Sequence, residues 1–201
     1  MPYEVTRRFE RELCTYTGAQ YAVAVNSCTA ALLLTCKWWR PRSPTYDCTL
    51  TIPARTYMSV PMAIRNAECW PLFDARRWIG AYQLLPSTIW DCARRFTSGM
   101  YIAGQFQCVS FSASKILGAE QGGAILHDNA EADAWFRRMR FDGRTEGVDA
   151  MEDTFDLVGH HCLMLPSVAA TLLVRLYHLP KHNEDLPERE YPDLSLHPAF
   201  K

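Results

Sequence analysis

Long apolar runs are missing from the sequence. No stretch approaches the roughly 18–20 apolar residues that a membrane-spanning helix needs, and residues 1–8 contain no apolar core of a secretion signal. An excess of one charge is missing too, because 21 Lys and Arg residues stand against 22 Asp and Glu residues, for a net charge of −1. Nucleic-acid binding therefore gets no support at the level of the whole chain. We expect a cytoplasmic protein without a membrane partner.

The spacing typical of a zinc site is also absent. None of the eight cysteines belongs to a Cys-x-x-Cys pair. Most of them lie in apolar or strand-like runs, as Cys108 does, so we expect reduced thiols packed in the core. His160 and His161 are neighbours, and adjacent side chains diverge in a helix or a strand. No metal site is predicted.

Short apolar runs alternate with amphipathic segments along the chain. The predicted strands are 21–25, 48–52, 69–73, 88–91, 107–112 and 122–127. The predicted helices are 5–17, 30–34 (opened by 26–29), 59–66, 132–139 (with Gly143 as C-cap) and 166–179. This alternation implies an α/β domain with a mainly parallel sheet. The tail from Pro180 is too polar for a core of its own, and we expect it to be extended or docked on a partner.

Parallel sheets bind ligands at the carboxyl ends of their strands. The polar residues at the predicted strand ends are Asn26, Ser27, Asp74, Asp91, Ser110 and Ser112. Pyridoxal 5′-phosphate (PLP) needs a lysine for its aldehyde, a carboxylate at its pyridine nitrogen, phosphate donors and a flat group on its ring. Lys115 and Asp91 suit the first two roles, the helix start at Ser27–Thr29 suits an anion, and Tyr57 suits the ring face. From these residues alone, PLP is one option among several.

Taken together, the segments resemble the DegT/DnrJ/EryC1/StrS family, PLP-dependent enzymes that mostly aminate keto-sugars bound to nucleotides. Residues 9–13 and 21–32 are similar to the family's opening helix, strand and phosphate turn, and residues 52–57 to its ring-stacking segment. Residues 108–115 with Gly122–Gly123 resemble its Schiff-base strand and turn. The likeness runs in order over about residues 5–175.

The resemblance implies the large domain of an aspartate-aminotransferase-like fold (PLP fold type I), with about six strands, over residues 1–158. Residues 159–201 would form a C-terminal helix and a tail, with the family's small domain essentially absent. The catalytic residues would be Lys115, which forms the Schiff base, and Asp91. The cofactor contacts would be Ser27, Cys28, Thr29, Tyr57, Asp91, Arg94, Ser110, Ser112, Lys115 and His161. Because sites of this fold form at a dimer interface, the resemblance also implies a homodimer.

Several positions depart from the family's pattern. Arg94 stands where the family has a Gln near the cofactor's phenolic oxygen, and Cys28 stands where it usually has Gly. Ser112 replaces a frequent His, and His161 replaces an Asn that reaches the partner subunit's site. Only 16 residues separate Asp74 from Asp91, where the family has a further strand and helix.

The resemblance favours an aminotransferase that passes an amino group from a small-molecule donor to a keto-sugar carried on a nucleotide. One alternative is a PLP-dependent decarboxylase or lyase acting on a bulky amino substrate, because a site without the small domain would be more open. The other alternative is an inactive, shortened paralogue that serves as a partner subunit. Retention of both Lys115 and Asp91 argues against the inactive form.

Overall fold

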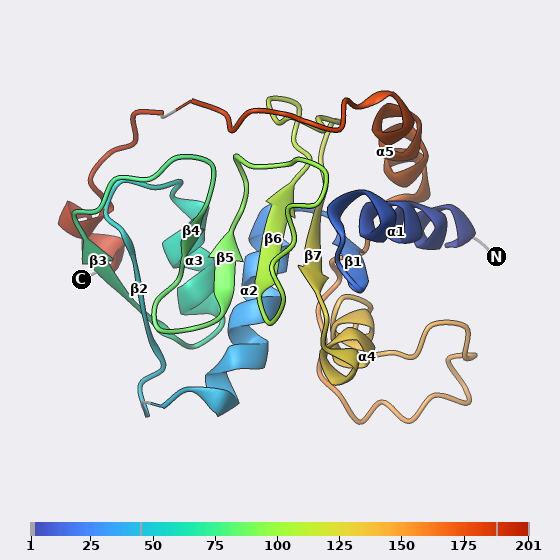
Figure 1. Ribbon diagram of the computed structural model, residues 1–201. Helices are drawn as coiled ribbons and strands as arrows, with labels where there is room; N and C mark the ends of the chain where they lie inside the picture. Colours follow the sequence, from blue (N-terminus) through green and yellow to red (C-terminus); the bar gives the residue numbers. More distant parts are fainter. Residues whose placement is uncertain (1–2, 45, 188, 201) are drawn as a thin grey trace.

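A computed structural model describes residues 3–44, 46–187 and 189–200, which form both helices and strands (Figure 1). The helices are α1 (Glu4–Thr17), α2 (Cys28–Trp39), α3 (Ser59–Asn66), α4 (Ala130–Met139) and α5 (Pro166–His178), with short 3-10 turns at Arg40–Arg42, Leu194–Leu196 and Pro198–Phe200. The strands are β1 (Tyr21–Val25), β2 (Thr49–Pro53), β3 (Trp70–Asp74), β4 (Tyr82–Gln83), β5 (Ile89–Asp91), β6 (Phe106–Ser110) and β7 (Gly123–His127). All predicted strands are present within a residue or two of their expected bounds, and β4 is additional.

The sheet is mixed, and this corrects the prediction of a mainly parallel sheet. Five strands follow the order β1-β7-β6-β5-β4, and β2 and β3 form a parallel pair beside them. Only β5–β6 and β2–β3 run parallel, whereas β1–β7, β6–β7 and β4–β5 run antiparallel. An apolar run predicts that a strand is buried on both faces, but it carries no signal for the direction of its neighbours.

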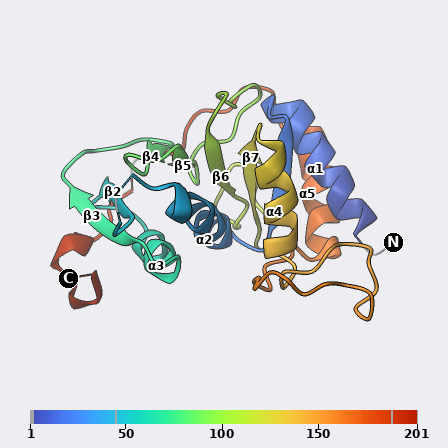
Figure 2. The ribbon, with the colours of Figure 1, turned by 90° about the horizontal axis from the view of Figure 1, so that it is seen from below.

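Helices cover both faces of the main sheet, which explains why its strands are continuously apolar. In β1, Val23 and Val25 belong to a core shared with α2, α3 and α4, whereas Ala22 and Ala24 belong to a core shared with α1 and α5. Alternate side chains of a strand point to opposite faces, so each face receives every second residue. Figure 2 shows α1 and α5 lying side by side at one end of the sheet.

The segment between β3 and β5 is short, and β4 fills the space between the two parts of the sheet. Thr51 of β2 and Leu85, just after β4, exchange two backbone hydrogen bonds of 2.7 and 3.0 Å. The Arg76 guanidinium donates to the carbonyls of Thr51 and Gln83 and so holds the same junction. The β2–β3 pair is therefore joined to the main sheet through the residues around β4.

The tail, described at residues 180–187 and 189–200, runs from α5 along one edge of the sheet to the β2–β3 pair (Figure 1). It docks on its own chain, where the sequence predicted an extended segment or one docked on a partner. Asp185 forms an ion pair of 2.6 Å with Arg95, and Leu194 N–H donates to the Ala54 carbonyl at 2.9 Å. Polar composition hid this docking, because the contacts use charged groups and backbone rather than apolar side chains.

Two findings bear on the classes of function. Over the described ranges, no helix is long and apolar enough to cross a membrane. All eight cysteines carry free thiols, and most are buried, as the sequence predicted.

Candidate active site

A cavity of about 320 Å³ opens at the sheet edge where β5 and β6 end and β7 begins. Segments far apart in the sequence line it, from the start of α2 to the tail. It brings together nine of the ten predicted cofactor contacts, which are Ser27, Cys28, Thr29, Tyr57, Asp91, Arg94, Ser110, Ser112 and Lys115. These nine residues therefore line one cavity, and their contacts with a cofactor stay a prediction.

One end of the cavity is formed by the start of α2. Ser27 is the N-cap, and its hydroxyl accepts a hydrogen bond of 3.1 Å from Ala30 N–H. Thr29 and Ser59 join their hydroxyls at 2.8 Å beside it. Unpaired N–H groups and the helix dipole make such a terminus favourable for an anion.

Gly123 lets β7 approach this helix start closely. A Cβ atom placed on Gly123 would lie 2.5 Å from the backbone nitrogen of Cys28, a distance that no side chain tolerates. The glycine pair predicted to mark the turn therefore has a steric role. The hydroxyls of Ser110 and Ser112, which also line the cavity, lie 3.5 Å apart and add further polar atoms.

Asp91 lies at the end of β5 and is only 3% exposed. Its Oδ1 accepts a hydrogen bond of 2.9 Å from Ala93 N–H, and its Oδ2 accepts one of 3.0 Å from the Tyr82 hydroxyl. Burial raises the pKa of Asp91 above its ordinary value, although these two donors and Lys115 act in the opposite direction. A cationic group that binds beside such a buried carboxyl stabilises its ionised form.

Lys115 lines the same cavity from the loop after β6. Its backbone N–H donates to the Ser112 carbonyl at 2.9 Å, which fixes the turn that carries the side chain. Burial lowers the pKa of Lys115 below its ordinary value, and the charge of Arg94 acts in the same direction, against the attraction of Asp91. The uncharged, nucleophilic amine is thus more accessible than in a solvent-exposed lysine.

The tail supplies lining residues that the sequence did not predict. Arg189 and Tyr191 both border the cavity, and the Tyr191 ring stacks on Trp78 with centroids 6.2 Å apart. Tyr57, which is 57% exposed, meets Tyr191 edge to face at 6.4 Å. The polar composition of the tail did not predict this position.

Arg94 has a second role besides lining the cavity. Its guanidinium donates to the Pro187 carbonyl, and its own carbonyl accepts from Leu186 N–H at 2.9 Å. Arg94 therefore holds the tail across the site. Its predicted contact with the cofactor's phenolic oxygen stays a prediction.

His161 lies outside the cavity. Its side chain is 77% exposed, and its Nδ1 lies 2.8 Å from the Asp142 carboxylate. The sequence predicted that this position serves the partner subunit's site, and that prediction remains open to test.

A second cavity of about 1120 Å³ adjoins the first and shares Trp78, Arg94, Arg189 and Tyr191 with it. Further arginines line it, namely Arg55, Arg76 and Arg77. Its acidic lining residues are Asp74, Glu190 and Asp193, so positive charge is in excess. Arginine forks suit the oxygens of phosphates and carboxylates.

The donor set of the first cavity fits PLP. It offers a lysine amine, a buried carboxylate, an anion-binding helix start with several hydroxyls, and aromatic rings. Each matches one part of that cofactor, namely the aldehyde, the pyridine nitrogen, the phosphate and the ring face.

The family model described as "DegT/DnrJ/EryC1/StrS aminotransferase family" matches residues 1–75 and 98–189. The unmatched residues between these two parts, 76–97, contain β4, Asp91 and Arg94. The role of Asp91 therefore rests on the cavity geometry. None of the curated proteins compared with the chain matches it.

Solved aminotransferase structures share the fold. S. venezuelae DesV, solved with a ketimine intermediate, superposes with a TM-score of 0.69 at 19% identity, over 88% of this chain and 57% of DesV. Helicobacter pylori PseC, an aminotransferase of pseudoaminic acid biosynthesis, gives 0.70 at 16% identity, over 88% and 58%. DesI, solved with its TDP-sugar product, gives 0.64 at 20% identity, over 88% and 53%. The chain spans little more than half the length of these proteins.

Proposed function

Since the chain belongs to the DegT/DnrJ/EryC1/StrS aminotransferase family, we propose that it is a PLP-dependent aminotransferase with Lys115 as its Schiff-base lysine. The acceptor would be a keto-sugar carried on a nucleotide, and the donor a small amino compound. The observation that carries the proposal is that Lys115 and Asp91 line one cavity with the hydroxyl-rich start of α2.

Bound PLP would supply an aldehyde that condenses with amines and a ring that accepts electrons from the substrate. The chain's own residues would divide the remaining work. Ser27, Thr29 and the N–H groups at the start of α2 would bind the phosphate. Asp91 would keep the pyridine nitrogen protonated, and Tyr57 would cover one ring face.

Lys115 would have two tasks. Its amine would hold the cofactor's aldehyde carbon until an amino substrate replaces it, and would then move a proton to and from the substrate's Cα. The lowered pKa of Lys115 suits both tasks, because an amine must be uncharged to attack a carbonyl or to accept a proton.

The arginine-lined second cavity supports a substrate that carries negative charge. It opens beside the cofactor cavity, so one substrate could place its reacting carbon in the first cavity and its anionic part in the second. A nucleotide-linked sugar has such a shape, and the printed description of the similar DesI structure names a TDP-sugar product.

A cytoplasmic homodimer completes the proposal. His161 is exposed on the protein surface and stands at the position that the family uses toward its partner subunit. Light scattering of the purified protein would measure its mass. A mass twice that of the chain is expected, and a monomer would remove the proposed role of His161.

The deciding experiment is an absorption spectrum of the protein with added PLP, before and after borohydride. Wild type is expected to show a visible imine band that borohydride fixes covalently, and Lys115→Ala is expected to lose both. Lys181→Ala is the matched control, because that exposed lysine lies outside the cavity and should behave as wild type. No band, or an equal band in Lys115→Ala, would exclude the proposed enzyme and favour the alternative of an inactive partner subunit.

A product assay separates the two reaction types. Incubation with amino substrates in the absence of any keto acceptor should release at most one equivalent of keto acid per site if the protein transfers amino groups, because the amino group then stays on the cofactor. Release of carbon dioxide or of an eliminated group would instead favour the decarboxylase or lyase.

A further inference from the structure

The short segment between β3 and β5 places one side chain directly against Asp91. In the antiparallel pair β4–β5, Tyr82 lies opposite Asp91 in register. Directly opposite residues of a strand pair point to the same face. The short segment therefore brings a phenol to the buried carboxylate, in a part of the chain that the family model leaves unmatched.

The Tyr82 hydroxyl links Asp91 to the segment after β2. It donates to Asp91 Oδ2 at 3.0 Å, and it lies 2.6 Å from the Thr56 hydroxyl. Because the phenol has a single proton and gives it to Asp91, Thr56 must be the donor in the second bond. The bonds therefore run in one direction, from Thr56 through Tyr82 to Asp91.

This chain of hydrogen bonds is buried throughout. Thr56 is fully buried, and Tyr82 and Asp91 are almost so. The Tyr82 ring packs against Trp78 with centroids 4.7 Å apart. The ring therefore contributes to packing, and the hydroxyl contributes the hydrogen bonds. Removing the hydroxyl alone therefore separates packing from the effect on Asp91.

Each carboxylate oxygen of Asp91 accepts one hydrogen bond. Ala93 N–H holds Oδ1 and Tyr82 holds Oδ2, and both donors are neutral. They orient the carboxylate, yet they leave its negative charge for a cationic ligand in the cavity. Without Tyr82, Oδ2 would be buried with one partner fewer, and the carboxylate could turn or take up a proton.

We propose that Tyr82, held by Thr56, is the positioning residue that keeps Asp91 ionised and turned toward the cavity. The proposal rests on the proposed function, because Asp91 is the group that would meet the cofactor's pyridine nitrogen. Tyr82 itself touches no reacting atom.

Two pairs of variants test it. Tyr82→Phe removes the hydroxyl and keeps the ring, and Tyr101→Phe is its control, because the Tyr101 hydroxyl donates to the Gln105 carbonyl away from the cavity. Thr56→Val removes the second hydroxyl, and Thr56→Ser restores it. The Thr56 pair decides the matter if Tyr82→Phe does not fold.

The first measurement is the titration of Asp91 by carbon NMR in the protein without PLP, with Asp91→Asn for assignment. Other groups near Asp91 are the thiols of Cys28, Cys92 and Cys108, whose pKa burial raises, and the Lys115 amine. The thiols stay neutral over the acidic range in which Asp91 titrates. The pKa of Asp91 is expected to rise in Tyr82→Phe and Thr56→Val, and to stay as in wild type in Tyr101→Phe and Thr56→Ser.

The second measurement is the dissociation constant of PLP. Loss of a hydrogen bond to a charged group should weaken binding ~10-fold in Tyr82→Phe, with a smaller loss in Thr56→Val. An Asp91 titration in Tyr82→Phe or Thr56→Val that equals its control would overturn the proposal. If wild type binds no PLP, the proposed function fails, and the titration still decides whether Tyr82 controls Asp91.

Discussion

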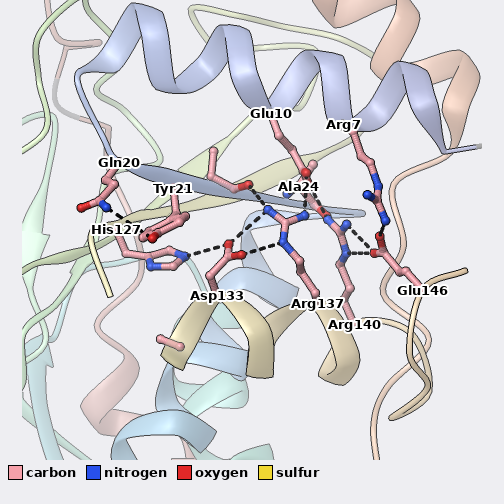
Figure 3. A network of polar contacts seen from close by, with 12 residues as sticks. Arg7, Glu10, Gln20, Tyr21, Ala24, His127, Asp133, Arg137, Arg140 and Glu146 are labelled. Atoms are coloured by element: carbon pink, nitrogen blue, oxygen red, sulfur yellow. Dashed lines mark hydrogen bonds and ion pairs between the residues drawn. The ribbon is translucent and has the colours of Figure 1, made fainter. Parts of the chain in front are cut away.

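Two buried carboxylates, Glu10 and Asp91, differ in what surrounds them. They are 4% and 3% exposed, so burial alone does not distinguish them. Glu10 accepts from Ala24 N–H and from the guanidinium groups of Arg137 and Arg140, at 2.9, 2.7 and 2.5 Å (Figure 3). Asp91 meets only neutral hydrogen-bond donors. The first carboxylate has its counter-charges built in, and the second is left to attract one.

The pKa values of the two carboxyls are shifted in opposite directions. Burial raises the pKa of Glu10, but the Arg140 and Arg137 charges outweigh it and bring the net pKa below the ordinary value. The pKa of Asp91 stays raised. A buried carboxylate with its charge unmatched costs stability, and such costs concentrate at functional sites.

The Glu10 cluster has a structural purpose. Arg137 also pairs with Asp133 at 2.8 Å, and Arg140 pairs with Glu146 at 2.7 Å (Figure 3). The cluster thereby ties α1, β1, α4 and the loop after α4 together. No cavity residue of the candidate active site takes part in it.

The largest effect is expected from Glu10→Gln. It leaves the buried Arg140 and the partly buried Arg137 with one carboxylate fewer each, and it should cost ~3–5 kcal/mol of unfolding free energy. Glu4→Gln, on the exposed side of the same helix, should cost less than ~1 kcal/mol, because its ion pair with Arg11 is in solvent. Urea unfolding would measure both. Equal costs would mean that the Glu10 cluster is no more structural than a surface pair.

Asp91→Asn should affect cofactor binding rather than stability. Because the folded pKa of Asp91 is raised, the ionised group lowers stability as the pH rises through that pKa, so the neutral amide should leave stability at neutral pH unchanged or slightly higher. PLP binding should weaken at least ~10-fold, because a charged partner is lost. Thermal unfolding would measure the stability, and a PLP titration would measure the affinity. A large loss of stability would mean that Asp91 has a structural role like that of Glu10.

The effect that is smallest at neutral pH concerns His127, which lies at the margin of the Glu10 cluster but is neutral. Burial lowers the pKa of His127 to about 4. Below the unfolded pKa, the unfolded chain takes up a proton that the folded chain refuses, so stability should fall by up to ~1.4 kcal/mol per pH unit between pH ~6.5 and ~4. His127→Phe should remove this slope, whereas Tyr21→Phe, which alters the ring stacked on His127, should keep it. Unfolding curves across that range would show which holds.

The sequence predicted most strands and the residues that gather at the cavity, because both depend on local signals. A short apolar run such as residues 21–25 forms a buried strand whichever strand it pairs with. A serine just before a helix caps that helix in any fold. Tyr82 and the Glu10 cluster were not predicted, because their partners are decided by strand pairing and helix packing over long separations. Glu10 lies 127 residues from Arg137, and a charged residue in an amphipathic helix is usually solvated.

The docked tail has a consequence for how the molecule folds. Its contacts join residues very distant along the chain, because Arg55 and Tyr191 differ by 136 in residue number, and Arg95 and Asp185 differ by 90. Closing loops of this length slows folding, because the entropy is lost before the contact is gained. During synthesis from the amino end, the sheet can form before the tail has left the ribosome. We therefore expect the wall of the cavity that contains Arg189 and Tyr191 to form after the sheet, with the cofactor pocket open on that side until then.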